Sequence, residues 1–413
     1  MIDTNRIFTD KAALMDGLTK KGYDAQRVEA VEKLLLAKKE QLQAVEILRQ
    51  KRNAVQSDKS VSVEEKRALR DQITELEQRL APLETEIDAL LLDIPNTPDI
   101  DAPVGKSEAD NVVAFEASDF YTCKAANPKP HWDLAKALDI LDVELASKVS
   151  GSMFAFYKGK GARLLRALVS YALALNGDKY QEIIPPHMVS SKTLGYTGHL
   201  PKFADEQYKA LLDDLWLIPT AEVPLTAGFA QNTYDAAELP KRVMGYSVCF
   251  RREAGSAGKD TRGLQRLHEF HKVELVKIVE PSQCKKELDD LLADCLRPIQ
   301  NLKLQYRILD LCTGDMGDKY GRCYDIEVYS PGVGKWLEVS SVGHFSDYQA
   351  RRAGIRYKDD SGKKSFAYTL NGSGLATPRV WTAIVETYQN ADGSVTVPEA
   401  LIPYMGCNLI EKQ

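Results

Sequence analysis

The apolar pattern of residues 26–94 restricts the fold of this chain more than any other feature. In its second half, apolar side chains recur at alternating spacings of four and three residues, at Leu69, Ile73, Leu76, Leu80, Leu83, Ile87, Leu90 and Ile94. This is the seam of a heptad repeat, which is typical of a long helix packed along a second helix. The first half continues the same grid at Val28, Val31, Leu35, Leu42 and Val45, with Lys38 at one core position. Because the polar run 57–62 is a turn signal, the sequence predicts an antiparallel helical hairpin with arms of roughly 40 Å.

Two further features of the hairpin bear on its shape and role. Pro82 lies inside the second arm, where its missing N–H and its ring predict a kink or an interruption. Basic residues gather near the tip, at Arg49, Lys51, Arg52, Lys59, Lys66, Arg67 and Arg70. By themselves these residues leave two roles open, an oligomerisation coil and an arm that contacts nucleic acid.

Composition limits the class of protein. A chain of 413 residues predicts more than one domain. The net charge of -5 argues against binding of nucleic acid by bulk electrostatics, although it allows a local basic stripe. The seven cysteines are scattered without a C-x-x-C pair, which favours reduced structural thiols. Since no apolar stretch approaches the roughly 18 residues of a membrane span, we expect a cytoplasmic protein without membrane contact.

The remainder of the chain predicts a second, larger domain. We place the N-terminal domain at 1–100, a linker at 101–118 and the second domain at 119–413. Helices are expected at 134–149 and 161–175, the latter followed by an extended run at 180–186. Apolar runs predict strands at 215–219, 243–250, 273–279, 304–311, 323–329 and 336–341. Several runs are too close together for crossover helices, so the sheet should be antiparallel, and the chain lacks dinucleotide and P-loop glycine motifs.

Residues 249–274 carry the most specific chemical signal. A polar, glycine-containing loop joins two apolar runs, and arginines at its ends suit a polyphosphate because guanidinium groups bind phosphate oxygens bidentately. The block resembles motif 2 of the class II aminoacyl-tRNA synthetases, and specifically of the seryl-tRNA synthetase family. The matching residues are Phe250, Arg251, Glu253, Gly258, Asp260, Thr261, Arg262, Gly263, Leu264, Arg266, His268, Phe270, Lys272, Val273 and Glu274.

The resemblance covers nearly the whole chain and implies a fold and an activity. The fold would be α+β, an N-terminal antiparallel coiled coil followed by a class II catalytic domain on an antiparallel sheet flanked by helices. The activity would be that of a serine–tRNA ligase, which activates L-serine with ATP and transfers it to tRNA(Ser), with tRNA(Sec) left open as a second acceptor. In this family the hairpin grips the tRNA, and the helix, strand and Pro186 of motif 1 build a homodimer interface. An ordinary helix–strand pair of the core fits the residues of motif 1 equally well.

The resemblance also implies residue roles for ATP. Arg251 would hold the α-phosphate and the serine carboxylate, and Glu253 and Phe270 would contact the adenine. Gly372 and Gly374 predict a tight backbone ahead of a helix, whose Arg379 would reach the γ-phosphate. Glu338 and Ser341 would bind Mg²⁺, for which oxygen ligands are suited. The full implied sets are Arg251, Glu338 and Arg379 for catalysis, and Arg251, Arg252, Glu253, Leu267, Phe270, Glu338, Val339, Ser340, Ser341 and Arg379 for ATP.

The serine pocket is implied in the same way. Its residues would be Thr220, Ala221, Glu222, Arg251, Glu274 and Ser373, with Glu222 near the ammonium. The runs 199–203 and 313–317 would supply pocket walls. No zinc is expected, since His268 and His271, the closest histidine pair, should lie on opposite faces of a strand.

One segment departs from the family pattern. Where the family commonly shows Ser-Ser-Cys-Ser-Asn, this chain has Ser340, Ser341, Val342, Gly343 and His344. The changes at 343 and 344 put the shape of the pocket edge in doubt. They keep open a paralogue that activates serine without charging tRNA, while a non-catalytic protein on the same scaffold is disfavoured by the intact arginines and glutamates.

Overall fold

The protein is described here by a computed structural model covering residues 1–58, 60–254 and 262–412. Lys59 of the predicted basic tip, and Gly258, Asp260 and Thr261 of the motif 2 match, lie outside the described residues. The chain divides into two compact units, Met1–Thr97 and Pro98–Gln413. The domain and linker limits predicted from the sequence stay a prediction.

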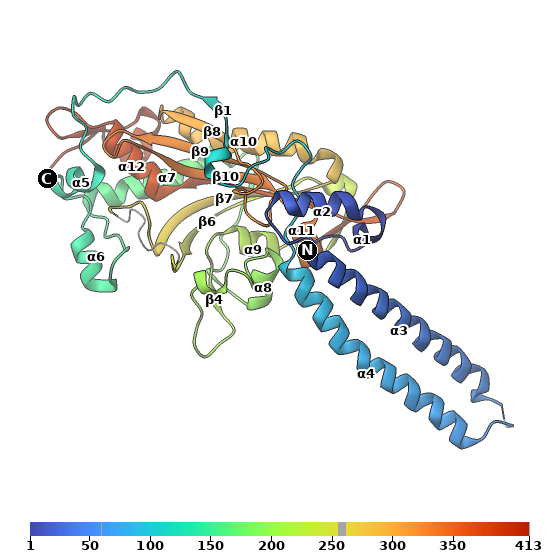
Figure 1. Ribbon diagram of the computed structural model, residues 1–413. Coiled ribbons are helices and arrows are strands. Elements are labelled where there is room, and N and C mark those ends of the chain that lie inside the picture. Colours follow the sequence, from blue (N-terminus) through green and yellow to red (C-terminus); the bar gives the residue numbers. More distant parts are fainter. Residues whose placement is uncertain (59, 255–261, 413) are drawn as a thin grey trace. The chain divides into compact units, whose positions relative to one another are not determined.

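The first unit is helical (Figure 1). Its elements are α1 (Arg6–Thr9), α2 (Lys11–Lys20), α3 (Arg27–Gln56) and α4 (Val63–Asp93). Apolar residues of all four helices form a core at the base of the hairpin, including Ile7, Leu14, Val31 and Ile87. Ser62 caps α4 by accepting from the Glu65 N–H while the Glu65 carboxylate accepts from the Ser62 N–H, so the sequence itself fixes where the second arm begins.

Ion pairs between the arms set the register of the hairpin. Arg27 pairs with Asp93 near the base, at 2.6 Å, and Lys38 pairs with Glu84 further out, at 2.8 Å. Arg49 and Glu77 are 2.7 Å apart nearer the tip. The two long helices are therefore antiparallel, as predicted, and their 30 and 31 residues correspond to about 45 Å each.

Two details of the hairpin differ from the expectation. Leu42, placed in the seam by the pattern, is 46 % exposed, and Val45 is the buried residue that packs with Ile73 and Leu80. The heptad grid drifts here because an α-helix has 3.6 rather than 3.5 residues per turn. Of the kink or interruption predicted at Pro82, the interruption does not occur, since α4 continues through Pro82 as one helix. Because Pro82 has no N–H, the carbonyl four residues earlier receives no helical hydrogen bond. The residues around that carbonyl are exposed, so water can take the place of the missing donor.

The second unit is built on a large sheet. Among the described residues it has eight strands, in the order β1-β8-β9-β10-β13-β7-β6-β2. Their bounds are β1 (Val112–Glu116), β2 (Gln181–Glu182), β6 (Lys241–Phe250), β7 (Glu269–Val279), β8 (Tyr306–Asp310), β9 (Arg322–Ser330), β10 (Lys335–His344) and β13 (Tyr368–Ala376). Neighbouring strands are antiparallel, except that β2 runs parallel to β6. The predicted antiparallel sheet is confirmed.

The sequence did not predict β13, the strand that holds the sheet centre. Gly372 and Gly374 were expected to form a tight backbone ahead of a helix, and both lie inside this strand, which leads into α12. A Cβ at Gly372 would come 2.7 Å from the Cys295 sulfur of α10 (Cys284–Asn301). Glycine is therefore needed for the close approach of a helix to the sheet rather than for a turn.

Helices pack against this sheet around one apolar core. That core unites buried residues of α7 (Gly159–Asn176), α10 and α12 (Thr377–Thr387) with those of the central strands. The helix predicted at 134–149 is instead two, α5 (His131–Ala137) and α6 (Val143–Ser150). Asp139 adopts a positive φ of 58° between them and Asp142 caps α6, so the chain turns where the apolar pattern alone suggested continuity.

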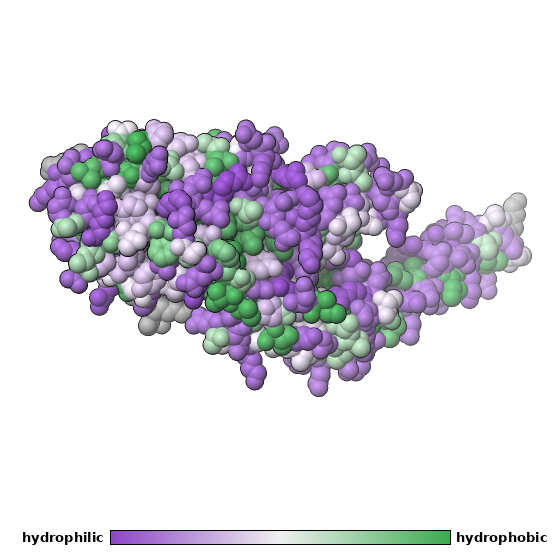
Figure 2. Space-filling model, turned by 90° about the horizontal axis from the view of Figure 1, so that it is seen from above, coloured by the Kyte–Doolittle hydropathy of each residue, from purple (hydrophilic) through white to green (hydrophobic). Residues whose placement is uncertain are grey.

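Smaller elements complete the second unit. They are β3 (Met188–Val189), α8 (Ser191–Tyr196), β4 (Trp216–Leu217), α9 (Glu222–Ala227), β5 (Thr233–Asp235), α11 (Tyr348–Ala353), β11 (Arg356–Lys358), β12 (Lys364–Phe366), β14 (Val395–Thr396), α13 (Ile402–Met405) and β15 (Leu409–Ile410). Figure 2 shows hydrophilic side chains over most of the face it presents, with hydrophobic ones scattered among them. Within the described ranges, every helix is too short or too polar to cross a membrane.

Candidate active site

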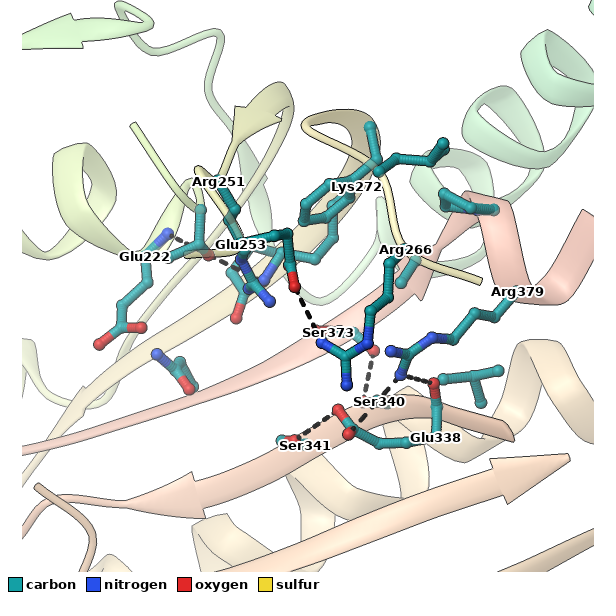
Figure 3. Close-up of a pocket in the computed structure, with 18 of the residues that line it drawn as sticks. Glu222, Arg251, Glu253, Arg266, Lys272, Glu338, Ser340, Ser341, Ser373 and Arg379 are labelled. Atoms are coloured by element: carbon teal, nitrogen blue, oxygen red, sulfur yellow. Dashed lines mark hydrogen bonds and ion pairs between the residues drawn. The ribbon is translucent and has the colours of Figure 1, made fainter. Parts of the chain in front are cut away.

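A cavity of about 390 Å³ lies over the central strands of the second unit (Figure 3). Its walls come from the residue that follows β6, the start of α9, the loop residues 264–267 and 319–320, the strands β7, β10 and β13, and the start of α12. The lining residues are His199, Thr220, Glu222, Arg251, Glu253, Leu264, Gln265, Arg266, Leu267, Phe270, Lys272, Glu274, Lys319, Tyr320, Glu338, Val339, Ser340, Ser341, Asn371, Ser373, Ala376, Pro378 and Arg379. Segments far apart in the sequence thus meet on one side of the sheet.

Two predicted arginines reach this cavity from different elements. Arg251 directly follows β6, and its guanidinium carbon lies 5.1 Å from the centre of the Phe270 ring. Arg379, in the first turn of α12, donates to the Glu338 carbonyl at 2.6 Å. Burial raises the pKa of the Glu338 carboxyl, but the charges of Arg379 and Arg251 outweigh it and leave that pKa lowered. Both positive charges therefore act on one place, which suits a polyanion.

Buried carboxylates also line the cavity. Glu222 is buried, and although burial raises its pKa, the charge of Lys319 prevails and lowers that pKa to about 2. Glu274 is buried as well, and there burial prevails over the charge of Lys272 and raises the pKa. Thr220 donates to Glu274 at 3.3 Å. An ammonium group would find hydrogen-bond acceptors in these carboxylates.

The structure brings most of the predicted site residues to the cavity, but two lie elsewhere. Ala221 packs in a separate apolar cluster with Leu225 and Val276. Arg252 is exposed, lies outside the cavity lining and donates to the Asp205 carbonyl at 3.2 Å, so its place beside ATP stays a prediction. Residues that follow one another in an extended segment point in opposite directions, which explains why Arg251 reaches the cavity and its neighbour does not.

Glu253, predicted to contact adenine, is held in place by another cavity residue. Its carboxylate accepts from Arg266 at 2.8 Å, and its backbone has a positive φ of 51°. A non-glycine residue in this conformation is held by its surroundings and is frequent at functional sites. Arg266 lies within the motif 2 match, but the sequence gave no indication that it pairs with Glu253.

A buried histidine anchors the far end of the motif 2 loop. His131 accepts the Leu264 N–H on Nε2 at 3.0 Å and contacts the Glu386 carboxylate through Nδ1 at 2.8 Å. A Cβ at Gly263 would lie 2.1 Å from the same Nε2, and Gly263 has a φ of +61°. Leu264 and the next residues line the cavity, so this contact positions one wall. Sequence reasoning missed His131 because the contact joins segments far apart in the chain.

Lys319 and Tyr320 also reach the cavity, although no pattern marked them. They follow the predicted wall segment 313–317, and Lys319 contacts both oxygens of Glu222, at 2.9 and 3.0 Å. Lys272 is the second lysine of the cavity, 2.5 Å from Glu274. A basic residue next to a loop is common in sequences, so only the fold identifies these pairs.

The departure at Gly343 and His344 affects the cavity indirectly. His344 is buried away from it, where Nε2 lies 2.8 Å from the Asp99 carboxylate. Gly343 packs under the ring of Tyr320, since a Cβ there would come within 2.6 Å of the ring and 2.4 Å of the Arg322 carbonyl. The smaller residue at 343 thus makes room for Tyr320 in the cavity wall.

The residues predicted to bind Mg²⁺ have the right chemistry. Ser341 donates to the Glu338 carboxylate at 3.2 Å. The pKa of nearby Asp325 is raised well above its ordinary value by burial and by the Glu338 charge. Two carboxyls that repel each other beside a hydroxyl form the oxygen-rich, anionic surroundings that a hard cation stabilises. Among the described residues, no three His, Cys, Asp or Glu side chains gather as a metal-binding group.

Comparisons with known proteins agree with this fold and site. Residues 203–388 match the family model of the tRNA synthetase class II core domain (G, H, P, S and T), and residues 1–98 match that of the seryl-tRNA synthetase N-terminal domain. The serine–tRNA ligase of Herpetosiphon aurantiacus is 45 % identical over 97 % of this chain and 98 % of its own. That of Geobacillus kaustophilus is 43 % identical over 98 % and 99 %.

Solved structures give the same result. The seryl-tRNA synthetase of Pyrococcus horikoshii, crystallised with ATP, superposes with a TM-score of 0.92 at 32 % identity and covers both chains completely. The cytoplasmic enzyme of Naegleria fowleri, in complex with AMP, has a TM-score of 0.90 at 26 % identity over 100 % of this chain and 99 % of its own.

The antiparallel sheet, the two arginines that line one cavity, and the match to the family model of the class II core domain define a class II aminoacyl-tRNA synthetase. Within that class, the chain belongs to the seryl-tRNA synthetase family. It is an enzyme, and its activity is the ATP-dependent ligation of serine to tRNA. A non-catalytic protein on this scaffold and a serine-activating paralogue, the two alternatives left by the sequence, are therefore set aside.

Proposed function

We propose that the cavity over β7, β10 and β13 performs both steps of serine–tRNA ligation with the residues that line it. In the first step a serine carboxylate oxygen bonds to the α-phosphorus of ATP, and the bond to pyrophosphate breaks. In the second, a hydroxyl of the terminal tRNA ribose attacks the seryl carbonyl and AMP leaves. The observation that supports this most is that Arg251 and Arg379, far apart in the chain, line one cavity together with Glu222 and Glu274.

The arginine side would hold ATP. Arg251 would bind the α-phosphate and the serine carboxylate together, which brings two anions into reaction distance and stabilises charge that builds at phosphorus. Arg379 would bind the γ-phosphate and would exchange its contact with Glu338 for it. Phe270 and Leu267 would contact the adenine, and Glu253 would accept from its amino group. Val339 and Ser340 would form the floor of this side.

The carboxylate side would hold serine. Glu222 would accept from the ammonium, and Glu274, Thr220 and Ser373 would surround the hydroxyl. Since an analogue without the hydroxyl would leave these buried groups unpaired, alanine should be rejected strongly. Threonine should be rejected by the limited size of the pocket.

Glu338 and Ser341 would hold Mg²⁺ with ATP, as the oxygen donors beside Asp325 allow. When bound, the ion would neutralise phosphate charge and orient the leaving pyrophosphate. Zinc is not expected to take part.

The helical hairpin would contact the tRNA, and a homodimer in the cytoplasm would be the working form. Lys51 and Arg70 are exposed near the tip and could meet phosphates, while Arg49 would exchange its pair with Glu77. Along motif 1, Ile184 is 84 % and Met188 is 43 % exposed, which supports an interface between two copies. Light scattering of the wild type and of Ile184→Glu would test it, and an unchanged dimer in the variant would remove this surface from consideration.

Serine-dependent exchange of pyrophosphate into ATP tests the proposed roles. Arg251→Ala should abolish exchange without unfolding the protein. Arg252→Ala is the matched control, because it removes the same charge from the neighbouring residue, which lies outside the cavity lining. Near-wild-type exchange by Arg251→Ala, or an equal loss in both variants, would contradict the role given to Arg251.

A further inference from the structure

The carboxylate proposed to bind the serine ammonium already contacts an ammonium of the chain itself. Lys319 Nζ lies 2.9 and 3.0 Å from the two oxygens of Glu222. Gln349 donates to one of these oxygens at 2.7 Å. Both side chains are largely buried, with 15 % of Lys319 and 6 % of Glu222 exposed. A second ammonium brought to Glu222 would therefore meet a like charge at close range.

The surroundings of the Lys319 ammonium form a complete receptor for a primary ammonium. Besides the two carboxylate oxygens, Nζ lies 3.4 Å from His199 Nε2 and 5.6 Å from the centre of the Phe345 ring. Burial, together with the Lys319 charge, lowers the pKa of His199 to about 3, so the imidazole is neutral and can accept. The Thr197 hydroxyl, 2.8 Å from Nδ1, can accept the remaining ring proton. The three ammonium hydrogens thus have acceptors.

The flexible side chain has a second place to go. Lys319 lines the active-site cavity and also an adjoining cavity of about 390 Å³. Glu206 lies on the wall of the adjoining cavity and offers another carboxylate. A lysine has four rotatable side-chain bonds, so the ammonium can change cavities while the backbone stays in place.

From these contacts we propose that Lys319 is a specificity-determining residue that competes with the substrate amino group for Glu222. Serine binds by displacing the Lys319 ammonium toward the adjoining cavity. Only a ligand with its own primary ammonium can make this exchange without leaving Glu222 unpaired, so amino acids are selected over hydroxy acids of the same shape. The proposal rests on the proposed role of Glu222.

Such competition lowers the apparent affinity for serine, which is proportional to the fraction of protein molecules in which Glu222 is not paired with Lys319. Lys319→Met removes the competing charge and keeps much of the apolar stem. It should lower the KM for serine at least about fivefold in pyrophosphate exchange, with the KM for ATP changed less than twofold. Lys286→Met is the control, because Lys286 forms a surface ion pair with Asp290 and lines neither cavity, so it should leave both constants unchanged.

Lys319→Arg tests the opposite direction and keeps the buried pair if the methionine variant folds poorly. A guanidinium can hold Glu222 bidentately, so this variant should raise the KM for serine. In the methionine variant, a KM for serine that rises would make Lys319 a substrate ligand, and one that stays within twofold would make it structural. Either result overturns the proposal.

Glu222→Gln separates this proposal from the function on which it rests. If Glu222 binds the ammonium, this variant raises the KM for serine at least about tenfold whatever Lys319 does. An unchanged KM in Glu222→Gln would refute the role of Glu222 itself. A raised KM there, combined with no gain in Lys319→Met, would refute only the competition.

Discussion

Glu386→Gln, which replaces one carboxylate oxygen by an NH₂ group, should strongly destabilise the second unit. The Glu386 carboxylate is buried and accepts hydrogen bonds from His131 N–H and Nδ1, the Ser330 hydroxyl, and the N–H groups of Gly332 and Val333. The Leu264 N–H donates to Nε2 of His131, so the ring proton is on Nδ1 and all five groups are donors toward Glu386.

The magnitude follows from the donors that lose an acceptor. A glutamine amide places an NH₂ where one carboxylate oxygen accepted, and at least two N–H groups then face another donor. Each bond lost to a charged acceptor costs about 1.5–3 kcal/mol, so we expect a loss of about 3–6 kcal/mol from two such bonds. That is a large part of the roughly 5–15 kcal/mol that stabilises a typical domain.

Urea unfolding followed by tryptophan fluorescence measures this loss. The four tryptophans, 132, 216, 336 and 381, all lie in the second unit, so the signal reports on that unit alone. Glu144→Gln is the control, since Glu144 pairs with Lys136 at the surface and should cost less than about 1 kcal/mol. Because His131 positions Leu264, the KM for ATP should also rise in Glu386→Gln. A free energy of unfolding within 1 kcal/mol of the wild type would refute the reasoning.

Three other predictions concern separate parts of the molecule. Gly343→Ser restores the common family residue, but it should lower the free energy of unfolding by about 1–3 kcal/mol, because the new Cβ would collide with Tyr320 and a backbone carbonyl. Thermal unfolding measures this change, and an unchanged stability would contradict the packing described here. Replacing residues 39–82 by a short turn retains the buried core at the hairpin base. This variant should keep serine-dependent pyrophosphate exchange and lose tRNA charging. Unchanged charging would show that the arm has only a structural role. His199 has a pKa near 3 when folded against 6.5 ordinarily, so its contribution to stability is present above pH 6.5 and is lost as the pH falls toward 3. Urea unfolding at pH 7 and pH 4 should show an acid loss roughly 3 kcal/mol larger in the wild type than in His199→Gln, and equal losses would contradict the shifted pKa.

The features that the sequence predicted correctly are those encoded locally. The hairpin follows from a repeat, the strand runs 243–250 and 273–279 from apolar continuity, and the match around Arg251 from neighbouring residues. The details that failed depend on distant contacts. Gly372 was expected to give a tight backbone ahead of a helix, but it lies inside β13, where the close approach of α10 to the sheet requires glycine.

The same division applies to the candidate site. Arg252 was assigned with Arg251 because they are adjacent in the motif, and only the direction of each side chain separates them. His131 and Lys319 were not found at all, since each acquires its role from a partner more than ninety residues away. A buried ion pair is invisible to any pattern confined to one segment.

The charged walls of the cavity suggest how substrates are selected. Each of its acidic side chains is paired with a basic one of the same cavity, in the pairs Glu222–Lys319, Glu253–Arg266, Glu274–Lys272 and Glu338–Arg379. An anion that bound alone would pair with an arginine but would leave the carboxylate of that ion pair without its partner. A cation that bound alone would leave the basic side chain without its partner. A ligand that presents an ammonium and phosphates together can replace both members of the pairs that it breaks, so the desolvation penalty is offset only for the complete substrate set. Such exchange would make the binding of serine and ATP mutually dependent, because each releases the charge that the other needs to meet.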